Sequence, residues 1–130
     1  MQVRCGSATV RKVGRAILIV DDHAVFRAAA RAMLEAGGFD VVAEAADGAA
    51  ALAAVAELRP DVVLLDVQLP DIDGFAVAER IAEDSSSPAI VLTSSRSVTS
   101  FRRRLAANPA WSFIPKSELS ADELAAAVGG

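Results

Sequence analysis

Two apolar runs in this chain each end in aspartate. Asp21 and Asp22 follow the run Ala16–Val20, and Asp66 follows the run Val62–Leu65. Neither run alternates with polar residues, so each predicts a strand covered on both faces, as in a parallel sheet between two layers of helices. Because open α/β sheets bind ligands in the crevice at the carboxyl ends of their strands, the three carboxylates are expected to meet there.

Three neighbouring carboxylates repel one another, which raises their pKa values unless a cation compensates. A divalent metal ion or an ammonium group could supply that compensation. The residues of this chain are compatible with either source.

The rest of the sequence alternates helical periodicity with short apolar runs. Apolar residues recur at spacings of three and four from Val25 to Leu34, which predicts a first helix that ends at two glycines. Ser120 and Glu123 have the spacing of a capping box and predict the start of the last helix. Further helices are expected at 49–58, 75–83 and 98–107, and further strands at 39–43, 89–92 and 111–114. This alternation predicts parallel strands, right-handed crossovers and one three-layer α/β/α domain.

Length and charge restrict the remaining choices. The chain has 130 residues, of which 53% are hydrophobic, enough for one domain, expected at residues 16–130. Residues 1–15 carry four basic residues and no acid, and are expected to be a disordered leader. The remainder is acidic, which argues against direct binding of nucleic acid. No apolar stretch reaches the roughly 20 residues of a membrane span, and no secretory signal is visible, so we expect a cytoplasmic protein without membrane contact.

Four segments, in order, carry a resemblance to a known family: LIVDDHAVFR, DVVLLDVQLPDIDGF, VLTSS and FIPKSEL. Together they resemble the receiver domain of two-component response regulators, over roughly residues 15–128. The last segment is most similar to receivers of the LuxR type (NarL/FixJ-like), which carry a helix-turn-helix output domain. The resemblance implies a flavodoxin-like, doubly wound sheet of five parallel strands in the order 2-1-3-4-5.

The resemblance also implies the chemistry: a histidine kinase or phosphotransfer protein transfers a phosphoryl group to Asp66 with the help of Mg²⁺. By family analogy Asp22 binds the ion directly and Asp21 binds it through water. Asp66 and the backbone carbonyl of Gln68 complete the protein ligands. The residue types suit this role, since a carboxylate attacking an anionic phosphoryl group needs charge neutralisation and Mg²⁺ prefers oxygen ligands.

The family also implies a switch. Lys116 and Thr93 would each contact a phosphoryl oxygen, and Phe113 would turn inward as the Thr93 hydroxyl moves toward the phosphoryl group. The surface that changes would comprise the fourth helix, fifth strand and fifth helix, through which a homodimer or an unidentified output partner could dock. Phe101 with Arg102–Arg104 is the expected partner-facing patch.

Alternatives exist for single residues. Asp22 alone would most often be the N-cap of the first helix. His23, the only histidine in the chain, is expected to face solvent in the first helical turn. The segment Asp71–Gly74 resembles part of a calcium loop but lacks the glutamate such a loop needs, so it predicts a turn and a helix start.

Alternatives also exist for the function. A phosphorylation-independent interaction module would keep the fold without the chemistry. A phosphohydrolase of the haloacid dehalogenase type ranks lower, because Gln68 stands where its general acid would follow Asp66. A flavin-binding electron carrier would not place two acids after the first strand. We therefore expect a phosphoacceptor that is not an enzyme, apart from hydrolysis of its own acyl phosphate.

Overall fold

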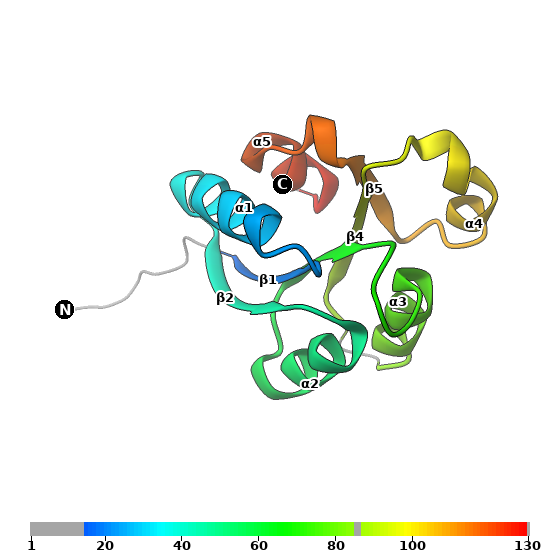
Figure 1. Cartoon of the computed structure of the whole chain (residues 1–130), viewed down its shortest axis with the longest axis horizontal. Coiled ribbons are helices and arrows are strands. Elements are labelled where there is room, and N and C mark those ends of the chain that lie inside the picture. Colours follow the sequence, from blue (N-terminus) through cyan, green and yellow to red (C-terminus); the bar gives the residue numbers. More distant parts are fainter. Residues whose placement is uncertain (1–14, 85–86, 130) are drawn as a thin grey trace.

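Five parallel strands form one sheet between two layers of helices in the computed structural model, which describes residues 15–84 and 87–129 (Figure 1). The strands are β1 (Ala16–Val20), β2 (Asp40–Ala45), β3 (Val62–Asp66), β4 (Ala89–Ser94) and β5 (Ser112–Pro115). The helices are α1 (Ala24–Ala36), α2 (Gly48–Leu58), α3 (Gly74–Ala82), α4 (Arg102–Ala106) and α5 (Ala121–Ala127), with 3₁₀ turns η1 (Val98–Phe101) and η2 (Lys116–Glu118). The strand order is β2-β1-β3-β4-β5, which confirms the predicted flavodoxin-like fold.

The unbroken apolar pattern of the central strands follows from burial on both faces. In β1, Ile17 and Ile19 pack toward α1 and α5, whereas Leu18 and Val20 pack toward α2 and α3 (Figure 1). All four side chains are at most 1% exposed. The two faces therefore enclose two separate apolar cores, and polar residues enter the central strands only at their carboxyl ends.

The helix expected at residues 98–107 is wrong in its first half. The chain makes the 3₁₀ turn η1 there, and only Arg102–Ala106 is α-helical. The β-branched residues Val98 and Thr99 favour helix weakly, and Phe101 leaves helical geometry at φ −122°. The side chain of Asn108 then donates to the carbonyl oxygen of Arg104 at 3.0 Å, at the end of the short helix.

Phe101 does not belong to the predicted partner-facing patch. It is only 5% exposed, and its ring lies 5.9 Å from that of Phe75 and 5.6 Å from that of Phe113, centroid to centroid. Aromatic pairs at such separations contribute beyond the area they bury. The arginines of α4 are exposed, so that part of the surface is charged rather than aromatic.

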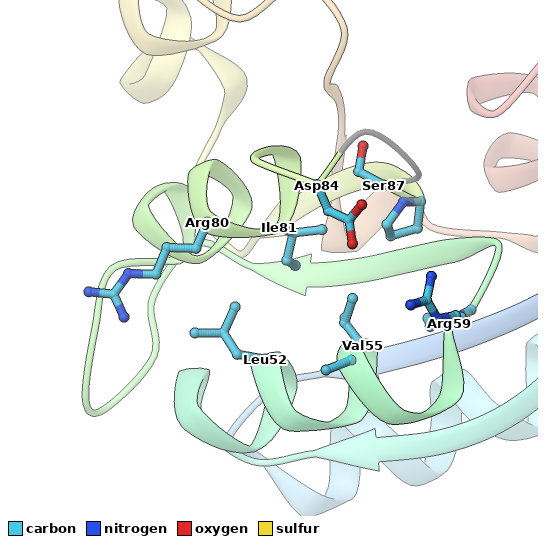
Figure 2. A pocket seen from close by; sticks show the side chains of 10 residues that line it. Leu52, Val55, Arg59, Arg80, Ile81, Asp84 and Ser87 are labelled. Atoms are coloured by element: carbon cyan, nitrogen blue, oxygen red, sulfur yellow. The ribbon is translucent and has the colours of Figure 1, made fainter.

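A cavity of about 220 Å³ lies between α2 and α3 (Figure 2). Its lining includes Leu52, Val55 and Ile81, with Arg59 and Asp84 among its polar residues. The prolines just before β3 and β4 also line it, so the cavity lies at the amino ends of these strands. The cavity and the aspartates therefore lie at opposite ends of the strands.

The expected leader, residues 1–15, lies outside the described residues except for Arg15. Within the described ranges, no helix is long and apolar enough to cross a membrane.

Candidate functional site

The three aspartates lie together at the carboxyl ends of β1 and β3. Asp21 is fully buried and Asp66 is 4% exposed, while Asp22 lies at the surface. One ligand atom from each aspartate and from His23 lies within 4.8 Å of the others. The structure thus brings into one pocket acids that are separated by more than 40 positions in the sequence.

Lys116 joins the two buried carboxylates. It begins η2 directly after β5, and its Nζ lies 2.6 Å from Asp21 Oδ2 and 3.3 Å from Asp66 Oδ2. The ammonium also lies 4.3 Å from the centroid of the Phe26 ring, a cation–π contact with a residue of α1. One cation thus contacts both buried acids.

The ionisable groups of this pocket respond differently to their surroundings. Burial raises the pKa of Asp66, although the backbone amide of Gln68 and the ammonium of Lys116 act in the opposite direction. Burial also acts to raise the pKa of Asp21, but Lys116 and the amide of His23 outweigh it and lower that pKa. The pKa of Lys116 is raised, because its two carboxylates outweigh its own burial. Asp21 and Lys116 thus form the charged pair, whereas burial disfavours the ionised form of Asp66.

The donor atoms fit a hard divalent cation. Asp21 Oδ2 is buried and, among the described residues, has the ion pair with Lys116 but no hydrogen bond of acceptable geometry. Buried carboxylate oxygens normally have such partners. Carboxylate oxygens are the ligands that Mg²⁺ prefers, usually one or two together with water.

His23 lies at the mouth of the pocket. Its side chain is 70% exposed, as predicted, and its Nδ1 lies 3.1 Å from Asp21 Oδ1 and 3.1 Å from Asp22 Oδ1. His23 occupies the N-cap position of α1, so the alternative that Asp22 is the N-cap is wrong. A carboxylate oxygen of Asp22 instead lies within 4.8 Å of the ligand atoms of Asp21, His23 and Asp66.

Thr93 and Phe113, the two residues of the predicted switch, lie on the neighbouring strands β4 and β5. Thr93 is the strand partner of Asp66, but its hydroxyl donates to the carbonyl oxygen of Ile114 at 2.7 Å. The half-buried ring of Phe113 packs against Phe101. In this state the hydroxyl is bonded to β5 and not to Asp66.

Sequence reasoning missed a second layer behind the acids. Arg27 donates from Nη1 to the backbone carbonyl of Asp21 at 2.7 Å and from Nε to Glu44 Oε1 at 3.1 Å. Arg31 also reaches Glu44, with its Nε 2.6 Å from Oε2. Arginines on the polar face of an amphipathic helix carry no sequence signal for such contacts, because the partner lies on β2.

Asp71 anchors the loop after β3. Its carboxylate accepts from the amides of Gly48 at 2.8 Å and Ala49 at 3.0 Å, at the start of α2. Asp73 accepts from the amide of Phe75 and is the N-cap of α3, so the predicted turn and helix start are confirmed. The loop that carries Gln68 is thus tied to α2 at one point and to α3 at another.

We predict that Asp71→Ala lowers the midpoint of urea unfolding, because two amides at the start of α2 lose their acceptor. Hydrogen bonds from these amides, that of Gly48 first, lower the pKa of Asp71. The stabilisation is therefore present above the pKa that the group has in the unfolded chain and is lost as the pH falls through the folded-state pKa. Urea titrations of both proteins at neutral and acidic pH measure this; a difference independent of pH would contradict it.

The fold and the acid pocket together define a receiver-like architecture. The chain belongs to the response regulator receiver domain family, whose model matches residues 17–129.

Individual relatives agree with this assignment. The chain is 42% identical over 82 residues to protein-glutamate methylesterase/protein-glutamine glutaminase 3 of Hahella chejuensis, a match covering 63% of this chain and 24% of the relative. It therefore spans about a quarter of the length of that protein. Among solved structures, the receiver domain of the putative response regulator NarL from Mycobacterium tuberculosis has a TM-score of 0.77 at 30% identity, covering 91% of this chain and 99% of that one. A two-component response regulator of the LuxR family from Aurantimonas sp. has a TM-score of 0.74 at 29% identity, covering 88% and 82%. The predicted likeness to LuxR-type receivers is confirmed.

Proposed function

We propose that this receiver domain accepts a phosphoryl group on Asp66 from a histidine kinase or phosphotransfer protein, in a reaction that requires Mg²⁺. The observation that carries the proposal is the ammonium of Lys116 within 3.3 Å of Asp66 and 2.6 Å of Asp21, inside a pocket of three carboxylates. Asp66 therefore offers a nucleophilic carboxylate oxygen next to the ammonium of Lys116.

The chemistry follows from the contacts of Asp66. The amide of Gln68 donates to Oδ1 at 3.1 Å, and Lys116 lies nearest to Oδ2, so the two oxygens have different environments. One carboxylate oxygen forms the bond to phosphorus while the bond from phosphorus to the donor's nitrogen or oxygen breaks, and the leaving group departs with that electron pair. Lys116 then faces a phosphoryl oxygen.

Asp21, Asp22, Asp66 and the carbonyl oxygen of Gln68 are the residues we propose to hold Mg²⁺. When bound, the ion neutralises the charge that the attacking carboxylate and the phosphoryl group bring together. Three carboxylates, one Mg²⁺ and one ammonium balance, and phosphorylation disturbs that balance by replacing the charge of one carboxylate with about −1.5 to −2.

The disturbed balance would drive the switch. We propose that the Thr93 hydroxyl leaves the carbonyl of Ile114 for a phosphoryl oxygen and that Phe113 turns inward behind it. Both states exist before phosphorylation, which shifts their populations. The changed surface lies on α4, β5 and α5, where an output partner or a second copy of the chain would dock. Phe113 contacts Phe101 directly, so its movement would reach η1 and α4.

Incubation of the protein with acetyl phosphate and Mg²⁺ tests the proposal. Intact-mass analysis should show a single added phosphoryl group that is stable in acid and labile in base, as an acyl phosphate is. Removal of Mg²⁺ with a chelator should prevent the modification. A wild-type protein that stays unmodified would support the phosphorylation-independent interaction module, and rapid sustained release of phosphate from sugar phosphates would support the phosphohydrolase.

A further inference from the structure

We propose that Arg27 is a positioning residue of the metal site: its guanidinium holds the main chain of Asp21, and Glu44 holds the guanidinium. This inference rests on the proposed function, because it concerns the affinity of the acid pocket for Mg²⁺. Arg27 itself contacts neither Asp66 nor a carboxylate of the pocket in its described hydrogen bonds.

The backbone of Asp21 is held on both sides. Its amide donates to the carbonyl of Ala45 at 3.0 Å, which extends the pairing of β1 with β2. Its carbonyl oxygen accepts from Arg27 Nη1 at 2.7 Å, and its carboxylate Oδ1 accepts from the amide of His23 at 2.8 Å. Arg27 therefore restrains Asp21, the residue directly after β1, at the point where the chain turns toward α1, and so restrains the direction of the Asp21 carboxylate.

Arg27 is itself oriented by its neighbours. Glu44 on β2 accepts from Arg27 through Oε1 and from Arg31 through Oε2. The side chain of Arg27 is 19% exposed and that of Glu44 27% exposed, so this contact is partly shielded from solvent. Hydrogen bonding to Arg31 lowers the pKa of Glu44, and Arg27 acts in the same direction, which keeps the acceptor ionised at neutral pH.

The geometry of the arginine side chain suits this task. Its planar guanidinium presents several N–H groups in a fixed geometry, so Nε and Nη1 can serve Glu44 and the Asp21 carbonyl at once. A lysine keeps the positive charge but concentrates its donors on one nitrogen, and cannot reproduce this two-nitrogen arrangement. Groups that orient metal ligands in this way commonly change metal affinity by about 10- to 100-fold when altered.

Charge and position make opposite predictions, which permits a sharp test. Arg27 is a cation near an acidic pocket, so by electrostatics alone its removal should strengthen the binding of Mg²⁺. If Arg27 positions Asp21, its removal should weaken the binding of Mg²⁺. Arg31 lies one turn further along α1, shares Glu44 and has no described contact with Asp21, which makes it the matched control.

The experiment measures Mg²⁺ affinity by calorimetry for the wild type, Arg27→Lys, Arg27→Gln, Glu44→Gln and Arg31→Gln. We expect both Arg27 variants to bind Mg²⁺ about tenfold more weakly, and Glu44→Gln about threefold more weakly because the hydrogen bond that orients the guanidinium loses its ionic partner. Arg31→Gln should stay within about twofold of the wild type. Thermal unfolding of each variant shows how much of it is folded, and Arg27→Lys, which keeps the positive charge, decides the matter if Arg27→Gln folds poorly.

Phosphorylation by acetyl phosphate supplies a second readout. In Arg27→Lys the Mg²⁺ concentration for half-maximal rate should rise with the loss of affinity, while the rate at saturating Mg²⁺ stays near that of the wild type, because Asp66 and Lys116 are unchanged. A folded Arg27→Lys or Glu44→Gln protein with wild-type Mg²⁺ affinity, or tighter binding in Arg27→Gln, overturns the inference alone. A wild type that binds no Mg²⁺ overturns the proposed function and the inference with it.

Discussion

Replacing Asp66 with asparagine should abolish phosphorylation by acetyl phosphate while leaving the domain folded. Asparagine has nearly the same shape and still offers an oxygen to the amide of Gln68, which lies 3.1 Å from Asp66 Oδ1. The amide lacks the nucleophilic carboxylate that forms the acyl phosphate. Intact-mass analysis after incubation with Mg²⁺ and phosphodonor should show no added phosphoryl group.

The same variant should gain stability in buffer without Mg²⁺. Burial raises the pKa of Asp66, and Asp21 contributes in the same direction, so the ionised form of Asp66 is disfavoured in the folded protein. A neutral amide removes that cost, and the midpoint of thermal unfolding should rise by a few degrees. The ion pair of Lys116 with Asp21 at 2.6 Å remains available.

The matched control is Asp40→Asn, the same chemical change at an exposed position on β2. This variant should be phosphorylated like the wild type. An Asp66→Asn protein that still acquires a base-labile phosphoryl group would place the phosphoacceptor on another residue, and loss of the modification in both variants would show a general effect of removing negative charge.

Replacing Gly74 with alanine should cause the largest loss of stability among simple glycine substitutions. A Cβ at this position would clash with the carbonyl oxygen of Asp66 and would lie 2.8 Å from the Cα of Val67. Both are backbone atoms, and the amide of Gly74 already donates to the carbonyl of Val67 at 2.7 Å. In Gly74→Ala the backbone at Asp66 and Val67 must therefore shift, and Asp66 is the proposed phosphoacceptor.

We expect Gly74→Ala to lower the free energy of unfolding by about 3 kcal/mol, or roughly 10 °C in melting temperature for a domain of this size. The usual gain of about 1 kcal/mol from alanine within a helix is too small to offset the clash. The folded fraction should also be phosphorylated more slowly, because the end of β3 is displaced. Chemical denaturation and the acetyl phosphate reaction measure the two effects.

Gly38→Ala is the control for this prediction. Gly38 has φ +97°, and no described atom lies within 4 Å of a Cβ built there. Alanine should cost about 1–2 kcal/mol through the left-handed conformation alone, without an effect on phosphorylation. If both variants lost the same free energy of unfolding, the loop after β3 would have to rearrange at little cost. The close approach of Gly74 to Asp66 would then be unimportant for stability.

The boundaries of the strands and helices show which predictions from the sequence were right and which were wrong. The strand expected at 62–65 and the helix expected at 75–83 lie within one residue of β3 and α3. The capping box is supported by Ser120, whose Oγ accepts from the amide of Glu123 at 3.0 Å. The helix predicted at 98–107 was wrong before α4, where the ring of Phe101 packs against Phe75 and Phe113. The helical periodicity of a sequence does not reveal such tertiary packing.

The sequence by itself determined the parallel sheet and the edge at which the acids meet. Unbroken apolar runs require cover on both faces, and aspartates at the ends of such runs are placed by the strands themselves, so local pattern was sufficient. Only the tertiary structure decided which way the Thr93 hydroxyl points, that the ring of Phe101 is buried, and that Arg27 holds the backbone of Asp21. These features depend on side-chain rotamers and on contacts between residues that are far apart in the sequence. Such contacts form only when the helices have packed against the sheet.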